Sequence, residues 1–133
     1  MSRIDPSSPI PLYAQIASRI RLAIATGDVA PAARLPSVRD LASQLRVNPA
    51  TVVRAYSELE QDGLVETRGT TGVFVKAVTQ ARCDGEKRGA ARRLIAEVLQ
   101  TASSLGLTLD DLNWAWQVQM NGNVSERRSS RGD

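Results

Sequence analysis

The sequence of 133 residues contains no histidine and only one cysteine, Cys83. Histidine is the commonest general base and the commonest transition-metal ligand of proteins, so its absence disfavours catalysis and metal binding. A zinc site would have to combine one thiolate with scattered carboxylates, an unusual ligand set for zinc. The chain also lacks a glycine-rich phosphate loop, a nucleophile elbow and paired carboxylates. These absences predict a protein that is not an enzyme and holds no metal or cofactor.

Long apolar runs are also missing. The N-terminal segment MSRIDPSSPIP has no apolar stretch of the kind found in signal peptides, and nothing approaches the length of a membrane span. One cysteine cannot form an intrachain disulfide framework, so the sequence predicts a cytoplasmic protein with no membrane partner. The net charge of +3, from 17 Lys+Arg and 14 Asp+Glu, is only mildly basic. The distribution of the basic residues must therefore decide whether nucleic acid is a partner.

Changes of composition divide the chain into five segments. Residues 1–10 are rich in proline and serine and predict an extended lead-in, whereas residues 11–77 contain three amphipathic helices and a hairpin. Residues 78–89 have the composition of a linker or a frayed helix start. Two helices are predicted within 90–120, and the polar segment 121–133 is predicted to be a disordered tail. The predicted fold class is mainly α with a small β-hairpin wing, a winged helix-turn-helix followed by a two-helix C-terminal segment.

The stretch 35–75 predicts two short helices joined by a tight turn and followed by the hairpin. Asn48 and Pro49 are preferred residues at the N-cap and first position of the second helix, and Gly63 is preferred just after its end. Helical spacing places four apolar residues of this helix on one buried face: Val52, Ala55, Tyr56 and Leu59. The opposite face is small, polar and basic: Ala50, Arg54 and Ser57. A helix with such a face suits insertion into a groove.

The segments around this helix also have recognisable signals. Ser37 predicts the start of the preceding helix, in a capping box with the aspartate three residues later. Arg46 occupies the turn, where glycine would most easily supply a positive φ. Strands are predicted at 64–67 and 73–76, around a five-residue loop with glycine at both ends. Residues 34–35 are expected to pair beside this hairpin.

In a helix-turn-helix, residues near the start of the second helix contact the base edges of the major groove. Asn48 can bond adenine or a phosphate, Thr51 suits a base edge or a phosphate, and Arg54 can bond guanine through two donors. The last turns of the same helix are acidic and would repel phosphates: Glu58, Glu60 and Asp62. Only the N-terminal half of the helix is therefore expected to approach DNA.

Taken singly, these residues have simpler explanations. Asn48 and Ser37 are explained as helix caps, and the arginines as a solvated face. The combination of cap, helix, turn, cap, helix, glycine and hairpin, with arginines on one side, is more specific and favours DNA binding. A winged-helix protein-interaction module without specific DNA readout stays open as the alternative.

Residues 10–76 resemble the winged helix-turn-helix domain of the GntR family of bacterial transcription regulators. The matching motifs are PLYAQIASRIRLAIATGDV, RLPSVRDLASQLRVNPATVVRAYSELEQDGLVET and RGTTGVFV. The NPATVVRAY form and the short C-terminal part resemble the YtrA subfamily, in which two helices after the winged domain mediate dimerisation. The chain departs from the family pattern at the wing tip, where Thr70 and Thr71 stand without a basic residue, and at Arg46, which replaces the usual turn glycine.

This resemblance implies a sequence-specific DNA-binding transcription regulator, expected to be a repressor, that binds a palindromic operator as a homodimer. Its third helix is expected in the major groove, with Arg34 and Arg68 on phosphates. The full set of predicted DNA-binding residues is Arg34, Ser37, Arg39, Asn48, Pro49, Ala50, Thr51, Arg54, Arg68, Gly69, Thr70 and Thr71.

The two predicted C-terminal helices carry more apolar side chains than an isolated pair can bury. The predicted dimerisation residues are Leu94, Val98, Leu99, Leu105, Leu109, Leu112, Trp114 and Trp116. Trp114 and Trp116 project about 200° apart on a helix, so one is expected to pack within the chain and the other against a second subunit. About 45 residues follow the predicted linker 78–89, too few for a roomy pocket. No effector site is evident, although a crevice between subunits stays open for a small molecule, as does a redox role for Cys83.

Overall fold

The computed structural model describes residues 4–131, with side chains described as far as residue 123, and divides the chain into two compact units, Met1–Ala90 and Ala91–Asp133. The elements in chain order are α1 (Leu12–Ala25), α2 (Val38–Leu45), α3 (Pro49–Gln61), β1 (Val65–Arg68), β2 (Gly72–Val75), α4 (Gln80–Ser104) and α5 (Leu109–Arg131). This mainly helical fold with one hairpin is the predicted class.

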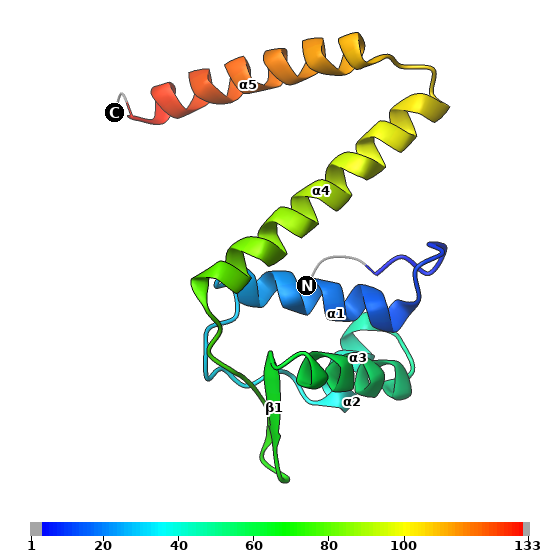
Figure 1. Cartoon of the computed structure of the whole chain (residues 1–133), viewed down its shortest axis with the longest axis vertical. Coiled ribbons are helices and arrows are strands. Elements are labelled where there is room, and N and C mark those ends of the chain that lie inside the picture. Colours follow the sequence, from blue (N-terminus) through cyan, green and yellow to red (C-terminus); the bar gives the residue numbers. More distant parts are fainter. Residues whose placement is uncertain (1–3, 132–133) are drawn as a thin grey trace. The chain divides into compact units, whose positions relative to one another are not determined.

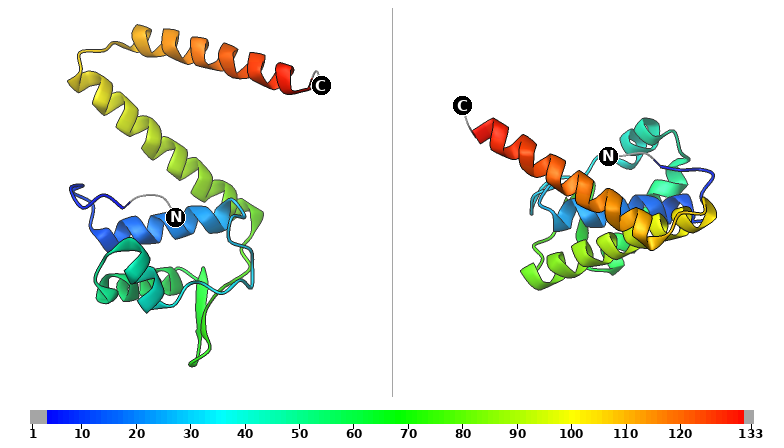
Figure 2. Two further views of the ribbon diagram at one scale, coloured as in Figure 1. Left: turned by 180° about the vertical axis from the view of Figure 1, so that it is seen from behind. Right: turned by 90° about the horizontal axis from the view of Figure 1, so that it is seen from above.

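The first unit is built on α1 and α3, which pack against each other, with α2 packed on α3 and the β1–β2 hairpin projecting from the helices (Figures 1 and 2). The predicted apolar face of α3 is confirmed, since all four of its residues are buried: Val52, Ala55, Tyr56 and Leu59. The Tyr56 hydroxyl donates to the Pro36 carbonyl at 2.7 Å, and burial raises the pKa of Tyr56 to about 12. These contacts fix α3 by its inner face and leave its outer face exposed.

Local side-chain caps set the boundaries of α2 and α3. Ser37 Oγ accepts from the Asp40 amide at 3.1 Å, which is the serine half of the predicted capping box. Asn48 Oδ1 accepts from the Ala50 amide at 2.9 Å. Between the two helices, Arg46 has φ +57, the left-handed conformation expected there. A non-glycine residue in this conformation costs about 1–2 kcal/mol, which the packing of the two helices must offset.

The hairpin differs from its prediction by one residue in each strand. β1 pairs with β2 from Val65↔Val75 to Arg68↔Gly72, so the loop has three residues, 69–71, where five are predicted. The Thr71 amide donates to the Arg68 carbonyl at 2.9 Å and closes the turn, with Gly69 at φ +51. Both terminal residues of the predicted loop therefore belong to the strands.

A third extended segment lies beside β2, as the sequence predicts. Arg34 forms an antiparallel bridge with Phe74, and the Leu35 amide donates to the Val73 carbonyl at 2.8 Å. The Val75 amide in turn donates to the Ala33 carbonyl at 2.9 Å. The hairpin is therefore tied to the segment that enters α2, which fixes the wing on the helix-turn-helix.

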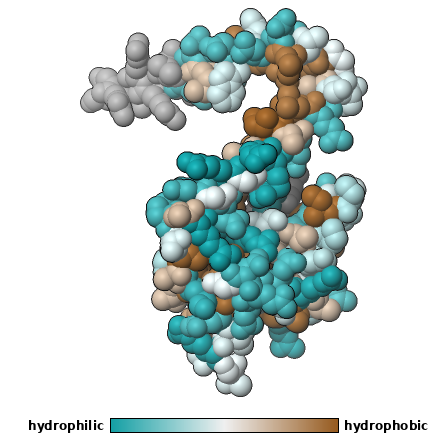
Figure 3. Space-filling view, in the orientation of Figure 1, coloured by the Kyte–Doolittle hydropathy of each residue, from teal (hydrophilic) through white to brown (hydrophobic). Residues whose placement is uncertain are grey.

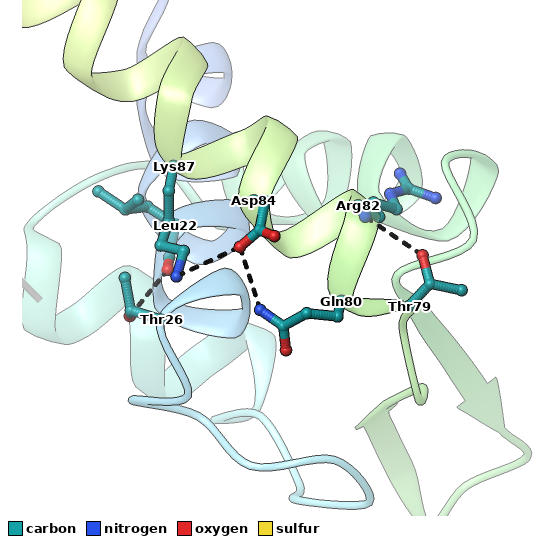
Figure 4. A network of polar contacts seen from close by, with 7 residues as sticks. All are labelled: Leu22, Thr26, Thr79, Gln80, Arg82, Asp84 and Lys87. Carbon is teal, nitrogen blue, oxygen red and sulfur yellow. Dashed lines mark hydrogen bonds and ion pairs between the residues drawn. The ribbon is translucent and has the colours of Figure 1, made fainter.

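Of the two interpretations of 78–89, a linker or a helix start, the structure has the helix, because α4 begins at Gln80. Thr79 caps this helix, its Oγ1 accepting from the Arg82 amide at 3.2 Å. Asp84 accepts from Gln80 Nε2 at 3.1 Å and lies 3.7 Å from Lys87 Nζ, so the first turns are held by side chains three and four residues apart (Figure 4). The polar composition that suggests a linker is that of an exposed helix surface.

The second unit contains the rest of α4 and all of α5. A complete capping box starts α5: Thr108 Oγ1 accepts from the Asp111 amide at 3.2 Å, and Asp111 Oδ2 accepts from the Thr108 amide at 2.8 Å. The Thr108 amide and hydroxyl both donate to the Asp111 carboxylate, and these two bonds lower the pKa of the carboxyl because they favour its charged form. The segment 121–133, predicted to be a disordered tail, is helical as far as Arg131, where α5 ends, and residues 132–133 lie outside the described residues. Polar composition alone does not distinguish a solvated helix from a disordered segment.

Large apolar side chains are concentrated on the surface of the second unit. Of the 13 exposed large hydrophobic residues in the described part of the chain, 11 lie between Leu94 and Met120. Figure 3 shows such residues gathered at the end of α4 and the start of α5. Trp114 and Trp116 are 70% and 58% exposed, so the expectation that one of them packs within the chain is wrong. Within residues 4–131, no helix combines the length and apolarity that crossing a membrane requires.

Candidate nucleic-acid interface

The predicted DNA-binding residues lie in three places on the first unit. Ser37 and Arg39 are at the start of α2, residues 48–51 and Arg54 are on the N-terminal half of α3, and Arg34 and residues 68–71 belong to the wing. All of them are exposed except Thr51, which is half-buried. Ser37 and Asn48 also cap their own helices. Capping uses oxygen lone pairs, so the Ser37 hydroxyl proton and the Asn48 amide protons stay free to donate to DNA.

The carboxylates at the C-terminal end of α3 interact with α1 and β1. Arg21 of α1 forms an ion pair with Asp62 and lies 3.8 Å from Glu58. Glu60 accepts from the amide and the hydroxyl of Thr67 on β1, at 3.1 and 3.2 Å. All three carboxylates therefore have internal partners. The negative charge predicted to repel phosphates is partly neutralised and held at the C-terminal end of the helix. The N-terminal half, whose first turn has no acidic residue, is therefore the half that suits DNA.

Arg54, on the exposed face of α3, lies against an aromatic ring. Its Cζ atom is 3.8 Å from the centroid of the Tyr13 ring, which belongs to the first turn of α1. A guanidinium at this distance over a ring face makes a cation–π contact. The sequence does not reveal this pair, because the two residues are 41 positions apart and only the packing of α1 on α3 brings them together.

Both wing arginines lie against the hairpin. Arg68 donates from Nε to Glu66 Oε1 at 2.7 Å, with Nη2 at 2.6 Å from the same oxygen, and its Cζ lies 4.5 Å from the centroid of the Phe74 ring. Arg34 lies across β2 at Gly72, where an added Cβ would be 2.7 Å from Arg34 Nε. Gly72 also has φ +139, which other residues rarely adopt. Both arginines therefore lie against residues of β2, Arg34 at Gly72 and Arg68 at Phe74, and the structure adds Glu66 as a residue that sequence inspection missed.

Removing the Glu66 charge is expected to strengthen non-specific DNA binding. In the free protein Glu66 competes with phosphate for Arg68, so Glu66→Gln releases one cation and should steepen the dependence of log Kd on log salt by about one. Fluorescence anisotropy with a random-sequence duplex across a salt series measures this slope. Glu86→Gln, on α4, makes the same change of net charge and is the matched control. Equal slopes for the two variants would mean that only net charge matters.

A buried helical scaffold, an exposed N-terminal half of α3 and a hairpin bearing arginines define a winged helix-turn-helix DNA-binding protein. The family profile described as "Bacterial regulatory proteins, gntR family" matches residues 12–75. The chain is 39% identical to the HTH-type transcriptional regulator Rv1152 of Mycobacterium tuberculosis, over 82% of this chain and 85% of that protein. It is 31% identical to the HTH-type transcriptional repressor YtrA of Bacillus subtilis, over 93% of this chain and 95% of that one.

A solved structure of the AraR DNA-binding domain in complex with operator ORX1 aligns with a TM-score of 0.50 and 27% identity, covering 56% of this chain and 99% of that one. The chain belongs to the GntR family, as the sequence motifs indicate, and is a DNA-binding transcription regulator of the YtrA-like type. Family and relatives alike are regulators and not enzymes.

Proposed function

We propose that this regulator is a cytoplasmic repressor that binds a palindromic operator as a homodimer, with α3 in the major groove and the wing along the DNA backbone. One observation supports the reading role of α3 best. Its N-terminal half is exposed, with Arg54 on the outer face, while every carboxylate at its other end is bonded to α1 or β1. That arrangement admits DNA to one half of the helix only.

The relatives support the finer parts of the proposal. The similar YtrA protein is named a repressor, and the AraR domain is solved on an operator. All four arginines are exposed, and we expect Arg54 to bond guanine and Arg34, Arg39 and Arg68 to contact phosphates. Because one wing has few basic groups, a single copy of the first unit, which carries α3 and the wing, is expected to bind DNA weakly.

The surface of the second unit supports homodimerisation. Exposed apolar residues line much of α4 and α5, and a hollow of about 350 Å³ at the end of α4 is lined by Leu94, Val98, Ala102, Leu105 and Leu112 among others. A monomer rarely exposes so many large apolar side chains in one region. We assign a second copy of the same helices as their cover, so that two reading helices face successive turns of one duplex.

Selection of bound DNA from a random pool tests the proposal. We expect enrichment of one inverted repeat whose half-sites lie about 10 bp apart, or a multiple of that spacing, and protection of both halves in footprinting. Recovery of single half-sites would contradict the homodimer. Equal binding of every sequence, together with a recovered protein partner, would favour the protein-interaction module instead.

A further inference from the structure

In the contact between Arg54 and Tyr13, the tyrosine ring is held by packing against the core. Tyr13 is half-buried and packs against the hydrophobic core cluster of the first unit, and α1 packs directly on α3. Its ring is therefore held on one side by the core. Arg54 is exposed and has a long side chain with many rotamers, so the ring is the fixed partner of the pair.

No ion pair among residues with described side chains involves Arg54, whereas Arg21 and Arg68 are both paired with carboxylates. A carboxylate would occupy the N–H groups that a guanidinium needs for a base or a phosphate. An aromatic ring contacts the flat face of the guanidinium and leaves the donors at its edge unused. Tyr13 therefore restrains Arg54 without occupying its donors.

Recognition of guanine requires those donors. Two parallel N–H groups of one guanidinium bond the O6 and N7 atoms of the base, which demands a fixed plane and direction. Ordering a free arginine side chain on binding loses conformational entropy, and a side chain that is ordered beforehand loses less. The cation–π contact also becomes stronger when DNA excludes water from it.

We propose that Tyr13 is a positioning residue for DNA reading, whose ring holds the Arg54 guanidinium ready to bond a guanine in each half-site. This inference rests on the proposed function, since it requires that α3 reads bases. It adds a residue of α1 to the determinants of specificity, although Tyr13 need not touch a base. The tyrosine hydroxyl is not part of the role, so phenylalanine should serve equally well.

The test compares Tyr13→Leu, Tyr13→Phe, Arg54→Ala and the double variant Tyr13→Leu/Arg54→Ala in the full-length chain. Kd is measured for the duplex selected from the random pool, for the same duplex with each half-site guanine replaced, and for a random-sequence duplex of equal length. Tyr13→Leu is expected to weaken binding of the selected duplex roughly 3- to 20-fold and to leave binding of random DNA nearly unchanged. Tyr13→Phe should behave as the wild type does.

The double variant shows whether Tyr13 acts through Arg54. In the Arg54→Ala background, Tyr13→Leu should cause no further loss of discrimination, because residues that act through one another are not additive. Equal losses on selected and random DNA, an undiminished effect in that background, or a defect in Tyr13→Phe as large as in Tyr13→Leu would each overturn the positioning role. Thermal unfolding of each variant separates these outcomes from loss of the fold.

A readout without DNA separates this inference from the proposed function. In NMR spectra of the free protein, the Arg54 side-chain N–H signal should show a ring-current shift that Tyr13→Phe keeps and Tyr13→Leu removes. If selection enriches an operator and Tyr13→Leu discriminates as well as the wild type, the positioning role alone is overturned. If selection enriches nothing, the proposed function and this inference both fall, whatever the NMR signal shows.

Discussion

Arg54→Ala is expected to weaken binding of the operator roughly 5- to 150-fold, because a bidentate arginine–guanine contact contributes about 1–3 kcal/mol. Binding of random DNA should change little, since that affinity comes from phosphate contacts distributed over the wing and the start of α2. The effect arises on α3 itself, where Arg54 is exposed and stacked on Tyr13. Loss of discrimination, not only loss of affinity, is the predicted signature.

Titration of the selected duplex and of a random duplex at several salt concentrations measures both quantities. Arg68→Ala removes the same charge from the wing and should weaken both duplexes alike, reducing the salt slope by about one at most. Because Glu66 already pairs with Arg68 in the free protein, we expect the reduction of the slope to be smaller than one. Arg88→Ala, on the exposed surface of α4, is the control for net charge. Equal weakening of both duplexes by Arg54→Ala would contradict a base-reading role.

The parts of the fold that the sequence predicts well are those with local signals. Asn48, Pro49 and Gly63 are preferred at the positions where α3 begins and ends, and the apolar spacing along α3 identifies its buried face. Arg46 has the expected positive φ because only three residues separate α2 from α3. Each of these signals acts within a few residues, so no tertiary information is needed to recognise it.

The parts that the sequence does not predict depend on contacts between distant segments. Tyr13 on Arg54 and Arg21 on Asp62 arise only because α1 packs along α3. Polar composition also misleads for 78–89, where the Thr79 cap and the Asp84 contacts support a helix that the abundance of charged residues conceals. Patterns of composition cannot distinguish a solvated helix from a linker, because both expose nearly every side chain.

The apolar surface of the second unit is another feature that the sequence predicts only in part. Sequence spacing places Leu94 and Val98 on one helical face, and the structure shows that the chain itself does not cover them, with exposed fractions of 61% and 43%. The packing of these side chains depends on the partner that covers them. A single chain therefore yields the candidate dimerisation residues but not their final packing.

Val98→Glu is expected to convert the protein into a monomer and to weaken operator binding roughly 100-fold or more. A carboxylate at this position would lose its hydration in an apolar interface, which strongly disfavours association. Linking two winged domains multiplies the DNA affinity of one by about 10²–10⁴, and a monomer loses that factor. The core of the first unit lies within residues 16–75, so the winged domain should keep its thermal stability.

Light scattering after size exclusion gives the mass, and titration of operators with two half-sites or one gives the affinities. For the wild type, two half-sites should bind far more tightly than one; for Val98→Glu the two duplexes should bind alike. Gln100→Glu adds the same charge to an exposed polar position on α4 and should stay dimeric. A dimeric Val98→Glu protein with undiminished operator affinity would place the subunit interface elsewhere. A monomeric protein with that affinity would show that one α3 and one wing suffice to read the operator.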